Sequence, residues 1–209
     1  FKIYIWDETK LQKLITKVPL FQSAICRCQY MIQKIDIYKY IVLYYFGGIY
    51  LDLDIQINKP FDKDFYKLIE GSELVFSYMR IYSLLPFQVV NNGIIIANRI
   101  GSPIFIDIIS KIPWDNMTYK NKDWAVLDTT GPFALGNIIK DHPSVLILQP
   151  DYLEGRPLVP WIGDSHGIYI THLHHSNWME AWLYIWIFIL KYIVAFLLFG
   201  FGIWLVRAQ

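Results

Sequence analysis

The chain has 209 residues, of which 55% are hydrophobic, 17% aromatic and 18% charged, and its formal net charge is +1. This near-neutral charge, without long lysine or arginine runs, gives no electrostatic basis for binding nucleic acid. Two cysteines, Cys26 and Cys28, are too few for a disulfide framework. Their spacing disfavours a mutual bridge, so we interpret them as free thiols on or near a helix.

Hydrophobic spacing and turn residues predict the elements of the first half of the chain. In chain order we expect a strand at 2–6, a helix at 11–18, a helix at 23–45, a strand at 49–57 and a short helix at 61–70. Pro19 is expected to end the first helix, and Gly47 with Gly48 to close the second, since glycine adopts the left-handed conformation that ends helices. The first half therefore alternates strands and helices.

The second half continues this alternation. In chain order we expect strands at 73–79 and 89–97, a helix at 102–111, a loop at 113–128, a helix at 129–141, a strand at 145–148, a loop at 151–166 and a strand at 167–171. Alternating strands and helices predict an α/β fold with a mostly parallel sheet, whose ligands bind beyond the carboxyl ends of the strands.

Two carboxylates, Asp52 and Asp54, lie near the end of the apolar strand at 49–57. Side chains two residues apart on a strand share a face, and buried carboxylates need a cation, hydrogen bonds or water. Magnesium and manganese prefer such oxygen ligands and often hold substrate phosphates. We therefore hypothesise a divalent metal that binds the diphosphate of a sugar nucleotide.

Other polar residues could face the same cavity. Asp36 and Lys39 share one helical face, either as a surface ion pair or as a polar edge of this site. Asn91 and Asn92 interrupt an apolar run, either as a turn or as a site lining. After the last strand, His172 begins a group completed by His174 and His175, and we expect at least one metal ligand among them.

The chain from Ala181 to Val206 is apolar except for Lys191. About 20 such residues suffice for a helix to span a bilayer, and four tryptophans near its ends suit the membrane interface. The alternative is a buried core helix; length and apolar character favour the membrane. We therefore divide the chain into a catalytic domain at 1–178 and a C-terminal transmembrane anchor at 179–209, with Lys191 snorkelling, paired or marking a break.

Residues 36–54 resemble the DxD sugar-binding region of family 32 glycosyltransferases, which include fungal Golgi mannosyltransferases and inositol phosphoceramide mannosyltransferases. The matching positions are Asp36, Tyr40, Gly47, Gly48, Asp52 and Asp54. The sequence departs from the family at Ile35 and Lys39, where serine and arginine are usual. The similarity extends over about residues 3 to 178 and includes 4–7, 91–93, 130–132 and 172–178. The usual first strand of the family is missing.

This resemblance implies a GT-A-like, Rossmann-type sheet flanked by helices and a retaining transferase that uses Mn²⁺ or Mg²⁺. It implies GDP-mannose as donor, a membrane lipid such as inositol phosphoceramide as acceptor, and a lumenal catalytic domain in the Golgi or ER. Asp52 and Asp54 would be catalytic and would bind the metal with His172. The implied substrate-binding residues are Asp36, Lys39, Asn91, Asn92, Gly131 and Trp178. No carboxylate is clearly a nucleophile, so front-face displacement is the working mechanism.

Three alternatives remain open. The enzyme could act on a glycan or protein acceptor, or the chain could be a non-catalytic, membrane-anchored module that binds sugar nucleotides. A haloacid-dehalogenase-type phosphatase also places Asp-x-Asp after an apolar strand. Gln56 occupies the threonine position of that motif, and no convincing lysine and acidic pair follows.

Overall fold

The computed structural model describes residues 2–79, 89–118, 121–155 and 166–173, together with Ile189, Ile193 and Phe196. These residues form a mixed α/β fold with a four-stranded and a two-stranded sheet. The α-helices are α1 Glu8–Ile15, α2 Pro19–Arg27, α3 Met31–Phe46, α4 Lys63–Leu68, α5 Pro103–Ser110, α6 Lys122–Leu127, α7 Pro132–Ile139 and α8 Pro150–Leu153, with a 3-10 helix η2 at Trp114–Thr118. The strands are β1 Gly48–Leu51, β2 Ile55–Ile57, β3 Leu74–Tyr78, β4 Val90–Ala97, β5 Val145–Leu148 and β6 Ile170–His172.

The larger sheet has the order β1-β4-β3-β5, and β2 pairs with β6 in the smaller one. Strand β4 runs antiparallel to both β1 and β3, and only β3 and β5 are parallel. The expected mostly parallel sheet is therefore wrong for the described residues. The connection between β3 and β4 spans residues 79–89, fewer than the dozen or so that a parallel crossover needs. Helices α5 to α7 lie in the long connection between β4 and β5, and β5 pairs with β3 in parallel.

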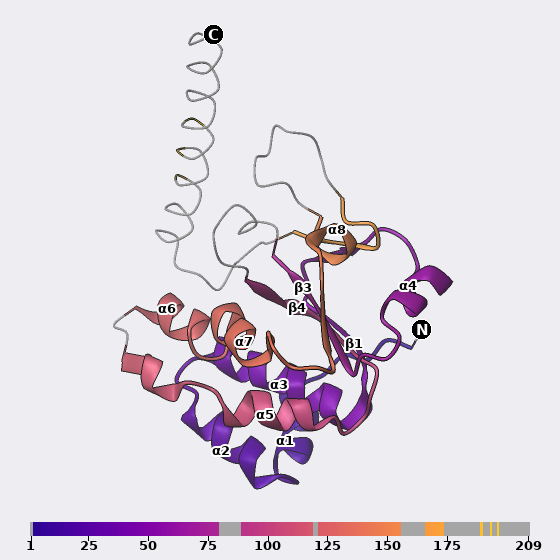
Figure 1. Cartoon of the computed structure of the whole chain (residues 1–209). Coiled ribbons are helices and arrows are strands. Elements are labelled where there is room, and N and C mark those ends of the chain that lie inside the picture. The colour runs from indigo at the N-terminus through magenta and orange to yellow at the C-terminus, as the bar shows by residue number, and fades with distance from the viewer. Residues whose placement is uncertain are drawn as a thin grey trace.

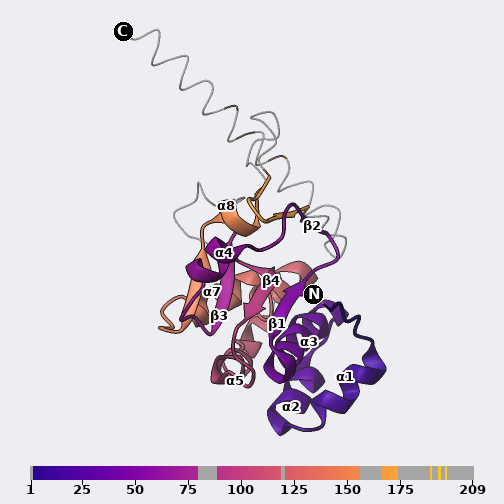
Figure 2. The same cartoon turned by 90° about the vertical axis from the view of Figure 1, so that its right-hand side faces the viewer.

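The sheet separates two hydrophobic cores, as strand side chains alternate between its faces. On β4, Ile95 and Ala97 pack with the core formed by α1, α2, α3, α5 and α7, whereas Ile94 and Ile96 pack with α4 and α8. Figures 1 and 2 show these two groups of helices on either side of the sheet. Strand β4 is thus buried on both faces, between two hydrophobic cores.

Several local expectations are corrected by the structure. The helix expected at 23–45 is two helices, and Pro19 begins α2, because proline suits the first helical position. The region at 113–128, expected to be a loop, contains η2 and α6, and the Asn121 side chain caps α6 by accepting from the N–H groups of Asp123 and Trp124. Residues 2–6 are not assigned to a strand.

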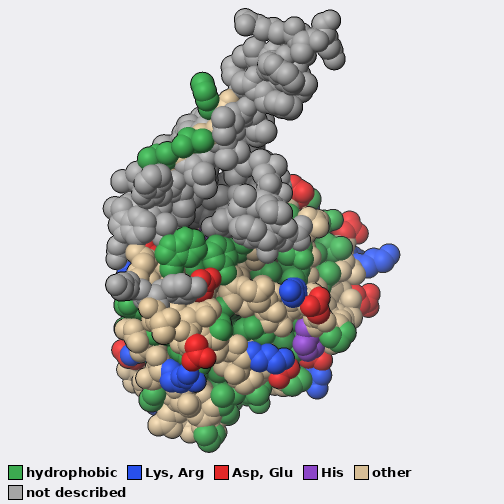
Figure 3. Space-filling model, turned by 60° about the vertical axis from the view of Figure 1, so that its left-hand side comes forward, with side chains coloured by type: hydrophobic (Ala, Val, Ile, Leu, Met, Phe, Trp, Pro, Cys, Tyr) green, Lys and Arg blue, Asp and Glu red, His purple; other side chains and the backbone are tan. Residues whose placement is uncertain are grey.

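Among the described residues, no helix has both the length and the apolar character needed to cross a membrane. The anchor expected at 179–209 lies outside the described residues apart from positions 189, 193 and 196, and it stays a prediction. Both cysteines are free thiols, as expected; Cys26 is exposed and Cys28 is half-buried. Lys and Arg side chains lie beside Asp and Glu side chains on the face drawn in Figure 3, in keeping with the net charge.

Candidate functional site

Asp52 and Asp54 lie in the connection between β1 and β2, where the chain passes from the larger sheet to the smaller one. The expectation of one continuous strand is therefore wrong. The connection is held at both ends: the Asp52 N–H donates to the Gly93 carbonyl at 2.8 Å, and the Asp54 carbonyl accepts from the Leu173 N–H at 2.9 Å. These contacts with β4 and with the end of β6 fix both carboxylates, while Leu53 between them is fully exposed.

His172 completes a cluster with the two aspartates. Ligand atoms of Asp52, Asp54 and His172 all lie within 4.8 Å of one another, and His172 Nε2 lies 3.3 Å from Asp54 Oδ1. This convergence depends on Gly93, because a Cβ there would lie 2.7 Å from Asp52 Oδ2 and 3.1 Å from His172 Cε1. The structure thus brings together the three residues that the sequence suggested as metal ligands.

The ion pair of Asp36 and Lys39 is buried, so its interpretation as a surface pair is wrong. Lys39 Nζ lies 3.0 Å from Asp36 Oδ1 and 3.8 Å from Asp52 Oδ1, with side-chain exposures of 2% for Lys39, 5% for Asp36 and 31% for Asp52. Lys39 also donates to the Asn92 carbonyl at 3.0 Å. The other Asp36 oxygen accepts from the Thr130 hydroxyl at 2.9 Å. This pair forms one wall behind Asp52.

The charges of the neighbouring aspartates keep Lys39 protonated. Burial by itself lowers the pKa of Lys39, but the negative charges of Asp36 and Asp52 outweigh it, so the pKa lies above its ordinary value. Burial raises the pKa of Asp36, and this effect is opposed by the Lys39 charge and by hydrogen bonds from Lys39 and Thr130. Lys39 therefore remains an ammonium group at neutral pH.

Both asparagines belong to β4, so the alternative of a turn is wrong. Asn92 Nδ2 donates to Asp36 Oδ1 at 3.0 Å. Asn91 Nδ2 donates to the Glu154 carboxylate and lies 2.9 Å from His172 Nδ1. Asn92 therefore lines the side of the site formed by Lys39 and Asp36, which we call the lysine side. Asn91 lines the side formed by His172 and Glu154, which we call the histidine side.

Gly131 precedes α7 as its N-cap, and a Cβ there would lie 2.9 Å from Leu127 Cα. Close packing accounts for this glycine, whereas its neighbour Thr130 contacts Asp36. The substrate-binding role suggested for Gly131 stays a prediction. Trp178, His174 and His175 lie outside the described residues.

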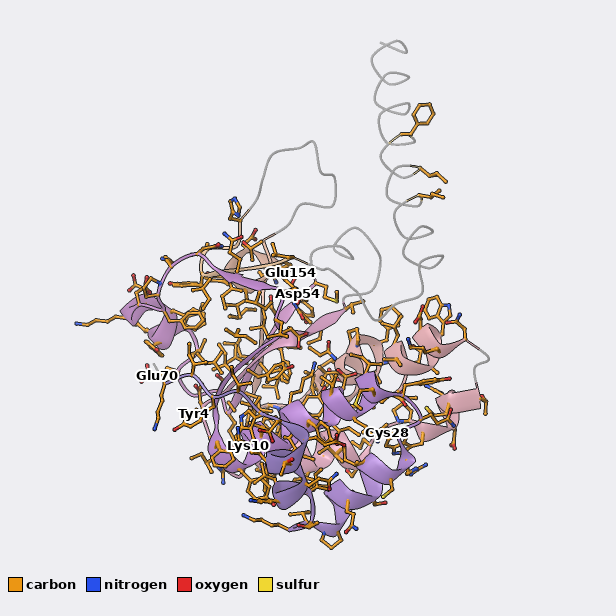
Figure 4. The ribbon with its side chains drawn as sticks, turned by 180° about the vertical axis from the view of Figure 1, so that it is seen from behind. Tyr4, Lys10, Cys28, Asp54, Glu70 and Glu154 are labelled. Atoms are coloured by element: carbon orange, nitrogen blue, oxygen red, sulfur yellow. The ribbon has the colours of Figure 1, made fainter. Side chains whose placement is uncertain are left out.

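Two residues of the site were not predicted from the sequence. Tyr50 donates its hydroxyl to Asp52 Oδ1 at 2.7 Å; the alternation of strand side chains, which places Tyr50 on the side of Asp52, could have suggested it. Glu154 follows α8, in a stretch expected to be a loop, and is fully buried. Its partners are distant in sequence, so no local pattern could have indicated it. Figure 4 shows Glu154 and Asp54 together at one end of the sheet, away from Lys10 and Cys28 on the helical side.

The histidine side of the site also carries a titratable cation. Burial by itself lowers the pKa of His172, but hydrogen bonds to Asp54 and Glu154 outweigh it and raise the pKa to about 9. A metal ion therefore has to compete with a proton at this ring. Two carboxylates and an imidazole with ligand atoms this close form a group that could hold a divalent metal ion.

Parts of the chain are similar to known proteins. The family described as "glycosyltransferase sugar-binding region containing DXD motif" matches residues 1–73. Inositol phosphoceramide mannosyltransferase 3 of Schizosaccharomyces pombe is 27% identical over 139 residues, which cover 66% of this chain and 36% of that protein. Inositol phosphoceramide mannosyltransferase 1 of the same yeast is 34% identical over 67 residues, covering 30% of this chain and 20% of its own length.

A third relative is glucan organizing enzyme 1 of Cryptococcus neoformans, 27% identical over 176 residues that cover 82% of this chain and 43% of that protein. The chain thus spans less than half of the length of each of these relatives. By these matches the chain is similar to DXD-type glycosyltransferases. The resemblance to family 32 is confirmed, and residues 1–73 carry its sugar-binding region, including Asp52 and Asp54.

Proposed function

We propose that this chain is the catalytic region of a metal-dependent, retaining glycosyltransferase that takes its sugar from a nucleotide diphosphate. The convergence of Asp52, Asp54 and His172 carries this proposal. The aspartates come from the sugar-binding region, and the histidine comes from a strand about 100 residues beyond the end of that match. Because His172 is far from the two aspartates in sequence, the three residues would form a metal site only in the folded chain.

In this proposal Asp54 and His172 would hold the metal directly, and Asp52 would contact the metal and the ribose of the donor. The bound metal would neutralise the diphosphate and stabilise the charge that develops on it as it leaves. Lys39 holds Asp36 and Asp52 in place from the buried side. Donor hydroxyls would meet Asn92 and Asp52 before the Asp36–Lys39 pair, because both are more exposed than that pair.

Retention of anomeric configuration needs either a protein nucleophile or attack on the face from which the leaving group departs. Asp36 and Glu154 are buried and accept hydrogen bonds from Thr130 and Asn91, respectively. Neither has the exposure expected of a nucleophile that attacks an anomeric carbon. This favours front-face displacement within the proposal.

For the donor and acceptor we propose GDP-mannose and an inositol phosphoceramide, on the strength of the two mannosyltransferases that resemble this chain. A lumenal site at a Golgi or ER membrane would suit such an acceptor. The glucan organizing enzyme keeps a glycan acceptor open. A module that binds sugar nucleotides without turnover remains the other alternative.

The test measures mannose transfer from GDP-mannose to inositol phosphoceramide with Mn²⁺ present. Asp54→Ala should lower turnover about 100-fold or more, because loss of a metal ligand removes several kcal/mol of charge stabilisation. The matched control is Asp107→Ala, which changes a half-exposed aspartate on α5. Undiminished turnover in Asp54→Ala would refute the metal assignment. Calorimetric binding of GDP-mannose by a wild-type chain without turnover would favour the binding module.

A further inference from the structure

The Nδ1 nitrogen of His172 faces both a hydrogen-bond donor and a hydrogen-bond acceptor. The Gly93 N–H donates to Asn91 Oδ1 at 2.7 Å, which orients the Asn91 amide so that Nδ2 points toward His172 and Glu154. Asn91 Nδ2 lies 2.9 Å from His172 Nδ1, and Glu154 Oε2 lies 3.6 Å from the same nitrogen. His172 Nδ1 therefore has both a hydrogen-bond donor and an acceptor within reach.

These two neighbours stabilise different forms of a neutral imidazole, which carries one N–H. If Nδ1 accepts from Asn91, the proton lies on Nε2 and points toward Asp54, at 3.3 Å. If Nδ1 carries the proton, it can donate to Glu154, and the Nε2 lone pair then faces the two aspartates. Only the second form offers Nε2 to a metal, and a carboxylate behind a metal-binding histidine is a recurring arrangement.

The position of Glu154 is built into the fold. Its carboxylate is fully buried, which costs several kcal/mol unless partners compensate. The His172 N–H donates to the Glu154 carbonyl at 3.0 Å, so the backbones of the two residues are joined directly. Asn91 connects both to the central strand β4. The distance between carboxylate and ring is thus set by secondary structure as well as by side chains.

We propose that Glu154 is a positioning residue that makes His172 a metal ligand. By accepting a hydrogen bond from the Nδ1–H group, Glu154 stabilises the form whose Nε2 is open toward Asp52 and Asp54. Of the two neutral forms of the ring, Asn91 stabilises the other. This inference rests on the metal site of the proposed function, and it adds to that site a residue beyond the region matched by the family.

The test is the affinity of the full chain for Mn²⁺, titrated by electron paramagnetic resonance without substrate. Glu154→Gln keeps the shape of the side chain and removes its charge. We expect Mn²⁺ to bind about 10- to 100-fold more weakly and the ¹⁴N coupling of the His172 ring, seen by electron spin-echo modulation, to decrease. The matched control is Glu73→Gln, whose carboxylate contacts Arg99 and Ser102 instead, and which should bind as the wild type does.

A double variant separates positioning from folding. Asn91→Asp combined with Glu154→Gln restores an amide opposite a carboxylate and places the carboxylate within reach of Nδ1. We expect it to regain most of the Mn²⁺ affinity and the ¹⁴N coupling. Recovery of the melting temperature without recovery of affinity would overturn the proposal.

Two further outcomes are distinguishable. Wild-type affinity and coupling in Glu154→Gln would overturn the role of Glu154 and leave the metal site intact. A wild-type chain that does not bind Mn²⁺ through His172 would overturn both this inference and the metal site of the proposed function.

Discussion

The two sides of the site pair carboxylates with different cations. On the lysine side, Lys39 lies between Asp36 and Asp52 and is buried. On the histidine side, His172 lies between Asp54 and Glu154. Each side therefore balances two negative charges with one cationic or titratable group, and the two sides meet at the connection between β1 and β2.

The two sides differ in whether the cationic side chain can lose its proton. The raised pKa of Lys39 keeps its ammonium group charged across the physiological range, so this side is a permanent support. The pKa of His172, raised to about 9, still allows the ring to lose its proton to a competing metal. A permanent charge on Lys39 and a titratable one on His172 thus lie side by side, and in the proposed function only the second gives way to a metal.

The largest effect is expected from Lys39→Met. This change leaves the buried Asp36 carboxylate without its cation, and breaking a buried pair in this way costs about 3–5 kcal/mol. Urea unfolding of the metal-free protein measures the loss. Lys111→Met is the control, because Lys111 is exposed and lies 3.9 Å from Asp107, so its loss should stay below about 1 kcal/mol. A Lys39→Met variant as stable as this control would remove the distinction between the two sides.

The second prediction concerns pH and the histidine side. Metal has to displace the His172 proton, so Mn²⁺ affinity should rise about tenfold per pH unit below the pKa of about 9 and then level off. The raised pKa also stabilises the metal-free fold at pH values below the ordinary pKa of histidine, and this contribution is lost as pH rises through about 9. Titrations with Mn²⁺ at several pH values measure the slope.

The control for the pH dependence is His172→Gln, which should bind Mn²⁺ more weakly and lose the part of the slope that arises from this proton. A wild-type affinity that does not change between about pH 6 and pH 8 would show that His172 is not exchanged for metal. The charge on the histidine side would then be as fixed as that on the lysine side.

Local sequence signals predicted much of the fold. The helix α5 begins where Ser102 and Pro103 indicated, because the Ser102 hydroxyl accepts from the Ile104 N–H within the same segment. Strands β3, β4 and β5 follow their apolar runs, because such a run is also a signal contained within one segment. Strand direction was predicted wrongly, since it depends on which strand each one meets in space, and that information is not local.

The candidate site also contains residues that local sequence signals indicated and residues that they did not. Asp52 and Asp54 stand out because they interrupt an apolar run, but the bend between them depends on hydrogen bonds to Gly93 and Leu173, far along the chain. Glu154 gave no signal, because its contacts with Asn91 and His172, which are distant in sequence, distinguish it from an ordinary loop residue. Sequence thus indicated the chemistry of the ligands, whereas the fold determined which groups support them.

The smallest effect is expected from Tyr50→Phe, which tests how much of the lysine side depends on its cation alone. Lys39 Nζ lies 5.1 Å from the centre of the Tyr50 ring, and phenylalanine keeps that ring, so only the hydroxyl donated to Asp52 is lost. This hydrogen bond to a half-buried carboxylate should contribute about 1 kcal/mol to the free energy of unfolding. Urea unfolding measures it, with the exposed Tyr66→Phe as control. A loss as large as that of Lys39→Met would mean that the hydroxyl, and not the ammonium group, is the main support of Asp52.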